Sequence, residues 1–179
     1  MTLVKSIKNL LDRLLEGLVM IVVAVLVVDV LWQVFTRFVI KKPSTWTEEL
    51  AIFMIIWVSL LGSAVALGRG AHLGIDYFVG KLPEKTRMGT EVFVFLCVSL
   101  FSLLVMLIGG IDLVRSTLEM GQESSALRVK VGYVYLAIPI SGFFLTLYGV
   151  IGLLERLGAL GQGRAANAEH VSASDAAID

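Results

Sequence analysis

Four long apolar runs constrain the fold of this chain more than any other feature of its sequence. They cover about residues 17–37, 50–68, 91–112 and 131–154. Apart from residues at the ends of these runs, Asp29 is their only formally charged residue. A helix of about 20 apolar residues crosses a bilayer core, and it satisfies its backbone hydrogen bonds without water. The sequence therefore predicts an all-α integral membrane protein with four transmembrane helices.

A soluble bundle of four helices is the alternative fold, and the composition argues against it. Of the 179 residues, 57% are hydrophobic and 17% are charged, whereas a soluble domain carries about 25% charged residues. Helices that are apolar on every side leave no polar face for water. Membrane lipid is therefore the expected surrounding of these helices. The net charge of zero gives no reason to expect nucleic acid as a partner.

Residues 3–16 precede the first run and are amphipathic. Leucine and isoleucine recur at helical spacing on one face, and Lys5, Lys8 and Arg13 lie on the other. This pattern predicts a helix that lies in the membrane interface. A water-exposed extension of the first span is the alternative interpretation. No small-residue cleavage site follows the apolar run, which indicates an uncleaved first span.

The distribution of basic residues predicts the orientation in the membrane. Nine Lys and Arg residues lie on the side of the two termini, and six lie on the other side. Because cytoplasmic segments carry the excess of Lys and Arg, both termini are expected in the cytoplasm. Residues 158–179 are rich in Ala, Gly, Ser and Asp and lack apolar periodicity. We therefore expect a disordered cytoplasmic tail there.

Asp29 lies deep in the first span, and Gln33 and Arg37 follow it at helical steps. An ionisable group at the bilayer centre costs about 2.5–3.5 kcal/mol, so it is expected to face protein or water. One hypothesis makes Asp29 a carboxylate that couples transport to protons or sodium. The other makes it an interhelical hydrogen-bond acceptor or an ion-pair partner of Arg37. The structural role is favoured, because no second charge lies within the spans.

Polar motifs flank the second span at both ends. Trp46, Glu48 and Glu49 precede it, where the interface suits tryptophan and the helix dipole favours acidic residues. Arg69 follows it, with His72 and Asp76 three and seven residues later. If the helix continues, these three side chains share a face and form a polar cluster at the membrane boundary. A metal site would need more ligands than one His and one Asp, so an ion-pair and hydrogen-bond cluster is the preferred interpretation.

Small residues recur every fourth position through the second span and beyond it, at Gly62, Ala66, Gly70 and Gly74. Such a stripe lets another helix approach closely, either from this chain or from a partner.

Residues that carry redox or nucleophilic chemistry are scarce. The chain has one cysteine, Cys97, and its histidines are His72 and His170. Haem within the membrane needs histidine ligands inside the spans, and disulfide chemistry needs a pair of cysteines. The sequence therefore predicts no enzymatic activity, no cofactor and no metal.

The motif order resembles the small permease subunit of tripartite ATP-independent periplasmic (TRAP) transporters. The resemblance rests on Trp46-Thr-Glu-Glu-Leu50, on a second span that contains Gly62, and on Arg69-Gly-Ala-His-Leu-Gly-Ile-Asp76. A second patch begins at Gln122 and ends around Pro139 on the approach to the fourth span. The match covers about residues 10–156, within a domain at 1–157. The family commonly has prolines near positions 125 and 130, which this chain lacks, so the shape of its last external loop stays open.

The resemblance implies a bacterial inner-membrane protein that pairs with a large permease subunit and a periplasmic solute-binding protein. The large subunit would carry the substrate pathway and the sodium sites, and a sodium gradient would drive uptake of an organic acid without ATP. The small subunit would act as a scaffold and offer docking surface to the binding protein. The flanking motifs would then serve architecture and partner contact. The alternative is a self-sufficient proton-coupled exporter of four spans that uses Asp29.

Overall fold

The computed structural model describes residues 2–42, 44–69 and 84–175 of the chain. Within these residues, four helical stretches are long and apolar enough to cross a membrane. They are Leu10–Phe38, Thr45–Gly68, Gly89–Glu119 and Val131–Gly158. The predicted all-α fold with four spans is confirmed, and the helices extend a few residues beyond most of the expected bounds.

The first hairpin consists of α1 (Thr2–Phe38) and α2 (Thr45–Gly68). Because α1 is one continuous helix, the separate interfacial helix expected at residues 3–16 is not formed, and this segment extends the first span. A single glycine at position 17 costs a helix only about 1 kcal/mol. Leu15, two residues before this glycine, is buried at 2% exposure and packs this part of α1 into the hydrophobic core.

The second hairpin begins with α4 (Glu84–Phe101), the π-helical segment η1 (Ser102–Gly109) and α5 (Gly110–Glu119), which follow one another without a break. It returns through α6 (Val131–Tyr135) and α7 (Ala137–Asp175). The break at Leu136 follows from Pro139, which has no N–H to donate to the carbonyl of Tyr135. The helical hydrogen bonds resume when the Ile140 N–H donates to the Leu136 carbonyl at 3.2 Å.

The C-terminal segment differs from the expectation of disorder, because α7 remains helical as far as Asp175. Alanine has the highest helix propensity, and the segment contains several alanines and no proline. The transmembrane part of α7 also supplies the helical nucleus, which is the costly step of helix formation. Low periodicity therefore did not prevent helix formation here. Residues 176–179 lie outside the described residues.

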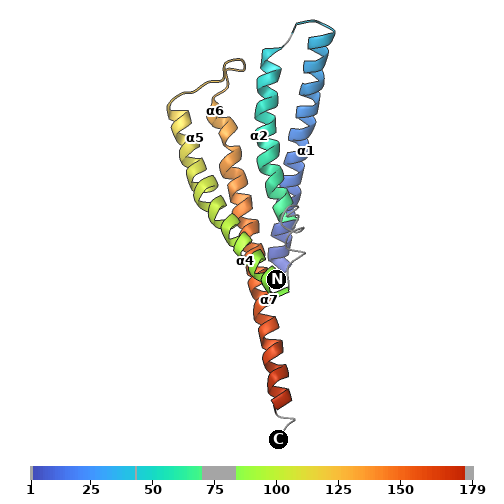
Figure 1. Cartoon of the computed structure of the whole chain (residues 1–179). Coiled ribbons are helices and arrows are strands. Elements are labelled where there is room, and N and C mark those ends of the chain that lie inside the picture. The colour runs from blue at the N-terminus through green and yellow to red at the C-terminus, as the bar shows by residue number, and fades with distance from the viewer. Residues whose placement is uncertain (1, 43, 70–83, 176–179) are drawn as a thin grey trace.

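The two hairpins join where α2 packs against α7. Leu61, Ala64 and Leu67 of α2 meet Leu145 and Tyr148 of α7 in the hydrophobic core. Figure 1 shows the hairpins converging toward the end of the bundle where α1 begins and diverging toward the other end. We call that other end, which carries residues 39–44 and 120–130, the loop end.

Within the second hairpin, glycines allow the helices to pack closely. A Cβ at Gly142 of α7 would lie 2.8 Å from the Met106 Cβ and 2.9 Å from the Leu107 backbone nitrogen of η1. Only a hydrogen atom fits at that distance. A hydrogen bond from the Thr146 hydroxyl to the Ser102 hydroxyl, at 3.0 Å, adds a polar contact between α7 and η1.

Candidate partner-contact site

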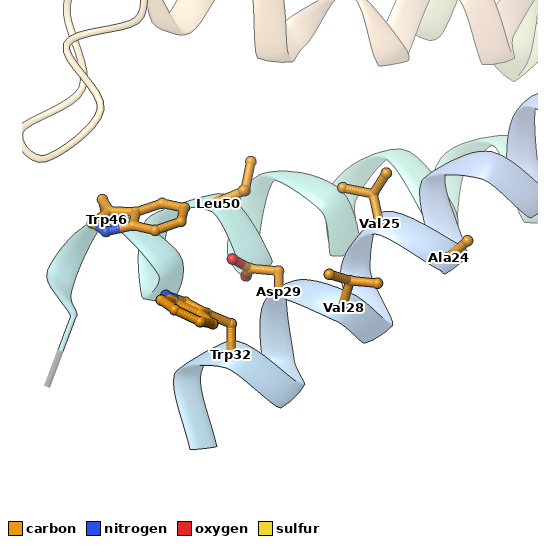
Figure 2. A pocket seen from close by; sticks show the side chains of 7 residues that line it. All are labelled: Ala24, Val25, Val28, Asp29, Trp32, Trp46 and Leu50. Atoms are coloured by element: carbon orange, nitrogen blue, oxygen red, sulfur yellow. The ribbon is translucent and has the colours of Figure 1, made fainter. Parts of the chain in front are cut away.

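A groove of about 580 Å³ opens between α1 and α2 near the loop end. Its walls are largely apolar. They come from Val25, Val28, Asp29 and Trp32 of α1 and from Trp46 and Leu50 of α2. Figure 2 shows the Asp29 carboxylate directed between the two tryptophan side chains, below Leu50. The groove therefore combines an apolar wall with one acidic group.

Asp29 is the buried acid of this groove, at 5% exposure. Neither of its carboxylate oxygens has a hydrogen-bond partner among the described residues. The expected ion pair with Arg37 is not formed, and Arg37 is exposed. Eight residues turn a helix through slightly more than two turns, which places Arg37 about 80° away from the direction of Asp29. An internal hydrogen bond to α2 is likewise not formed.

Thr36 is another buried polar residue on this part of α1, and its hydroxyl is satisfied locally. The buried Thr36 hydroxyl donates to the Gln33 carbonyl at 3.0 Å. Gln33 is half-buried. Of these polar groups, Asp29 is therefore buried without a partner among the described residues, and Thr36 is satisfied within its own helix.

Glu49 fastens the second hairpin to α2 at the loop end. Its carboxylate accepts backbone hydrogen bonds from Ser125 at 3.1 Å, from Ala126 at 2.9 Å and from Leu127 at 2.9 Å. Consecutive N–H groups that converge on a carboxylate form a strong, charge-assisted arrangement. The sequence identified Glu49 only as an acid near a helix N-terminus, because nothing in it indicates a partner 76 residues away.

The loop that Glu49 holds is compact although it lacks prolines. The Val131 N–H donates to the Gln122 carbonyl at 3.0 Å, and Glu123 and Lys130 form an antiparallel bridge. Arg128 has a positive φ of 52°, which turns the chain back toward the bridge. Backbone pairing and the Glu49 carboxylate thus give the loop at residues 120–130 the shape that the sequence left open.

The remaining motif residues at the loop end have separate positions. Trp46 lines the groove at 45% exposure, and Glu48 is exposed in the first turn of α2. Pro139 is buried beside Gly110, whose Cβ would lie 3.2 Å from the Pro139 ring. A Cβ at Gly62 would meet no atom within 4 Å, so among the described residues this part of the small-residue stripe is not covered by another helix.

A different polar cluster lies at the opposite end of the bundle. The exposed Arg69 side chain forms an ion pair with Glu16 of α1 at 2.8 Å. The Tyr148 hydroxyl of α7 donates to the Asp12 carboxylate. The partners Asp12, Glu16 and Tyr148 were not identified from the sequence, although the first two lie one helical turn apart. His72 and Asp76 lie outside the described residues.

An ion pair between Arg156 of α7 and Glu91 of α4, at 2.8 Å, ties the second hairpin at the same end. In the part of the chain that the structure describes, no three His, Cys, Asp or Glu side chains gather in a way that could hold a metal ion.

Sequence comparisons place this geometry beside known proteins. A family model described as the DctQ component of tripartite ATP-independent periplasmic transporters matches residues 26–159. The sialic acid TRAP transporter small permease protein SiaQ of Vibrio cholerae is 26% identical over 141 residues, which cover 79% of this chain and 80% of that protein. The C4-dicarboxylate TRAP transporter small permease protein DctQ of Rhodobacter capsulatus is 29% identical over 97 residues, covering 53% of this chain and 41% of that protein.

A longer protein shares part of the sequence. The sialic acid TRAP transporter permease protein SiaT of Haemophilus influenzae is 38% identical over 73 residues, which cover 38% of this chain and 12% of that protein. In this relative, the region similar to the present chain is therefore a small part of a much longer permease.

Proposed function

Because the chain belongs to the DctQ component family of TRAP transporters, we propose that it is the scaffold of a sodium-driven uptake system for an organic acid. The observation that carries this proposal is the family match across residues 26–159, which includes the last three spans and the C-terminal part of the first. The chain is a small permease subunit and a multi-pass inner-membrane protein on the same ground. Its scaffold role, sodium coupling and substrate class are the finer parts of the proposal.

The scaffold role draws support from how little of each span the chain covers by itself. In the most apolar stretch of each span, between 17% and 33% of the residues are buried within the chain. The rest is left to lipid or to another membrane protein. Asp29 is also the only charge within the central part of the apolar runs, so these helices offer few groups that could couple an ion to a substrate.

A large permease subunit is the proposed partner of these helices. In the longer relative from Haemophilus influenzae, a segment similar to this chain and the rest of a permease lie in one polypeptide. Such fusion is expected for two parts that function side by side. We propose that this chain makes the same association as a separate subunit.

The loop end is proposed to face the periplasm, with both termini in the cytoplasm. Four exposed basic residues lie at the loop end: Lys41, Lys42, Arg128 and Lys130. This basic surface, supported by the Glu49 anchor, is where a periplasmic solute-binding protein would dock. The names of the relatives mention sialic acid and C4-dicarboxylate, so an organic acid is the proposed class of substrate.

Reconstitution of transport tests the proposal. Vesicles that contain this chain, its large permease subunit and the binding protein should take up a labelled organic acid when an inward sodium gradient is imposed. Omission of this chain should abolish or strongly reduce uptake. Undiminished uptake without the chain would contradict the scaffold role, and uptake that is indifferent to sodium would contradict the coupling.

The same vesicles separate this proposal from a self-sufficient exporter. Vesicles that contain this chain alone should show neither uptake nor proton-coupled efflux. Efflux by the chain alone, lost in the Asp29→Asn variant, would support the exporter instead.

A further inference from the structure

We infer that Asp29 is an anchor for a lysine or arginine side chain of the large permease subunit, which enters the groove between Trp32 and Trp46. The inference rests on the proposed function, because it assigns part of the surface on which the scaffold meets its partner. It specifies where on this chain the large subunit binds, which charge its contacting side chain carries, and how deep in the membrane the contact lies.

The first step is the charge balance of the groove. Asp29 is 5% exposed, and both of its oxygens lack partners among the described residues. The other side chains that line the groove carry no formal charge. A buried ionised carboxylate is unfavourable unless it is paired and hydrogen-bonded, so an ionised Asp29 needs a compensating group from beyond the described residues of this chain.

The second step concerns the chemistry of the site. The carboxylate points toward the gap between two indole side chains, with Leu50 above it (Figure 2). Tryptophan is the aromatic side chain that attracts cations most strongly through its ring face. A carboxylate beside two such rings is suited to an ammonium or guanidinium group. The half-exposed Trp32 and Trp46 leave room for that group to enter from the membrane side.

The third step decides between a lipid and a protein as the source of the cation. Asp29 lies nine residues before the end of α1, which corresponds to about 13 Å along the helix axis. Trp32 and Trp46 lie between Asp29 and the loop end, at the level expected for interfacial tryptophan. The amine of a lipid is the outermost part of its headgroup. To reach Asp29, the amine would have to bring the charged lipid phosphate past the tryptophans and into an apolar groove. A transmembrane helix can present a side chain at any depth, which favours the protein.

The test uses the complex of this chain with the large permease subunit. An affinity tag on this chain captures the large subunit from detergent-solubilised membranes, and the retained amount is compared for wild type, Asp29→Asn and Asp29→Glu. Loss of one member of a buried charge pair weakens an interface substantially. The amount of large subunit retained by Asp29→Asn should therefore be lower than that retained by wild type by a factor of about ten or more. Asp29→Glu should restore part of the loss. Asp112→Asn, at an exposed acid of α5, is the matched control and should retain the wild-type amount.

A second measurement guards against a simple folding defect. Thermal unfolding of the isolated chain in detergent should show Asp29→Asn to be as stable as wild type or more stable, because the substitution removes an unpaired buried charge. A lower melting temperature for the isolated variant would place the partner of Asp29 inside this chain and overturn the inference.

The remaining outcomes separate the possible failures. Equal retention of the large subunit by wild type and Asp29→Asn would overturn this inference and leave the proposed function intact. Failure of the wild-type chain to retain the large subunit would overturn both. Native mass spectrometry of the isolated chain with phosphatidylethanolamine covers the lipid source. If Asp29→Asn loses the bound lipid and still retains the large subunit, the cation is the lipid amine and the inference is overturned.

Discussion

The two hairpins close their helix–helix interfaces in different ways. In the second hairpin, side chains of one helix pack against glycines of the other. For example, Met106 of η1 lies against Gly142 of α7. In the first hairpin, α1 and α2 leave a groove near the loop end, and Asp29 in this groove has no hydrogen-bond partner among the described residues. Gly62 of α2 meets nothing that would touch a Cβ.

The difference teaches which hairpin satisfies its own helix–helix interface. Interhelical packing in a membrane comes from close van der Waals contact and from satisfied polar groups. The second hairpin has both within the chain. The first hairpin has an unfilled groove and an unsatisfied charge, as expected for a surface that a second membrane subunit completes.

The largest effect is expected from filling the packed glycine of the second hairpin. A leucine at position 142 would collide with the Met106 Cβ and the backbone of Leu107. Overpacking of this kind costs about 1–3 kcal/mol or more, and thermal unfolding in detergent would measure it. Gly62→Leu is the control in the first hairpin and should leave the isolated chain near wild-type stability. Similar losses for the two variants would remove the distinction between the hairpins.

The next effect concerns the link between the hairpins. Tyr148→Phe removes the hydrogen bond from α7 to Asp12 of α1. Loss of one such bond costs about 1 kcal/mol, which should lower the free energy of unfolding of the isolated chain. Tyr133→Phe, at an exposed position of α6, is the matched control. If both variants match wild type, the Tyr148 hydroxyl does not help to join the hairpins.

A smaller and local effect is expected at the loop end. Glu49→Gln replaces the carboxylate that holds the amides of Ser125, Ala126 and Leu127. A neutral amide has a single carbonyl oxygen to accept these bonds, so hydrogen exchange at the three amides should become faster while global stability stays nearly constant. Glu48→Gln should leave exchange unchanged. Unaltered exchange in Glu49→Gln would show that the loop holds itself without α2.

The smallest effect is expected for a solvent-facing ion pair of the second hairpin. Arg115 and Glu119 lie one turn apart on α5, and both side chains are exposed. Pairs of this type contribute about 0.5 kcal/mol or less, so Arg115→Ala should have nearly wild-type stability by thermal unfolding. A loss as large as that of Gly142→Leu would show that surface charge, not glycine packing, stabilises this hairpin.

The sequence was sufficient for the fold because the main cause of the fold is local. Long apolar runs without charge require helices in a bilayer. The tail was harder to predict, because its alanine content favours a helix whereas its low apolar periodicity favours disorder. The interfacial helix was predicted from amphipathicity, which does not reveal that Leu15 packs into the core.

The candidate site was only partly predictable for a different reason. Its residues were identifiable one by one, since a deep aspartate and the Trp-Glu-Glu motif stand out in an apolar sequence. Their partners depend on contacts between distant segments, such as Glu49 with Ser125 or Tyr148 with Asp12. The absence of a partner for Asp29 is also a tertiary property, since it depends on how α1 turns toward α2.

Site-specific photocrosslinking tests the difference between the hairpins most directly. A photoreactive residue is placed at Val28 beside the groove or at Phe93 of α4, which have similar exposures of 67% and 65%. Each variant is expressed with the large permease subunit and irradiated in membranes. Position 28 should give the adduct with the large subunit, and position 93 should not. An adduct from position 93 with none from position 28 would contradict the conclusion that the partner completes the first hairpin.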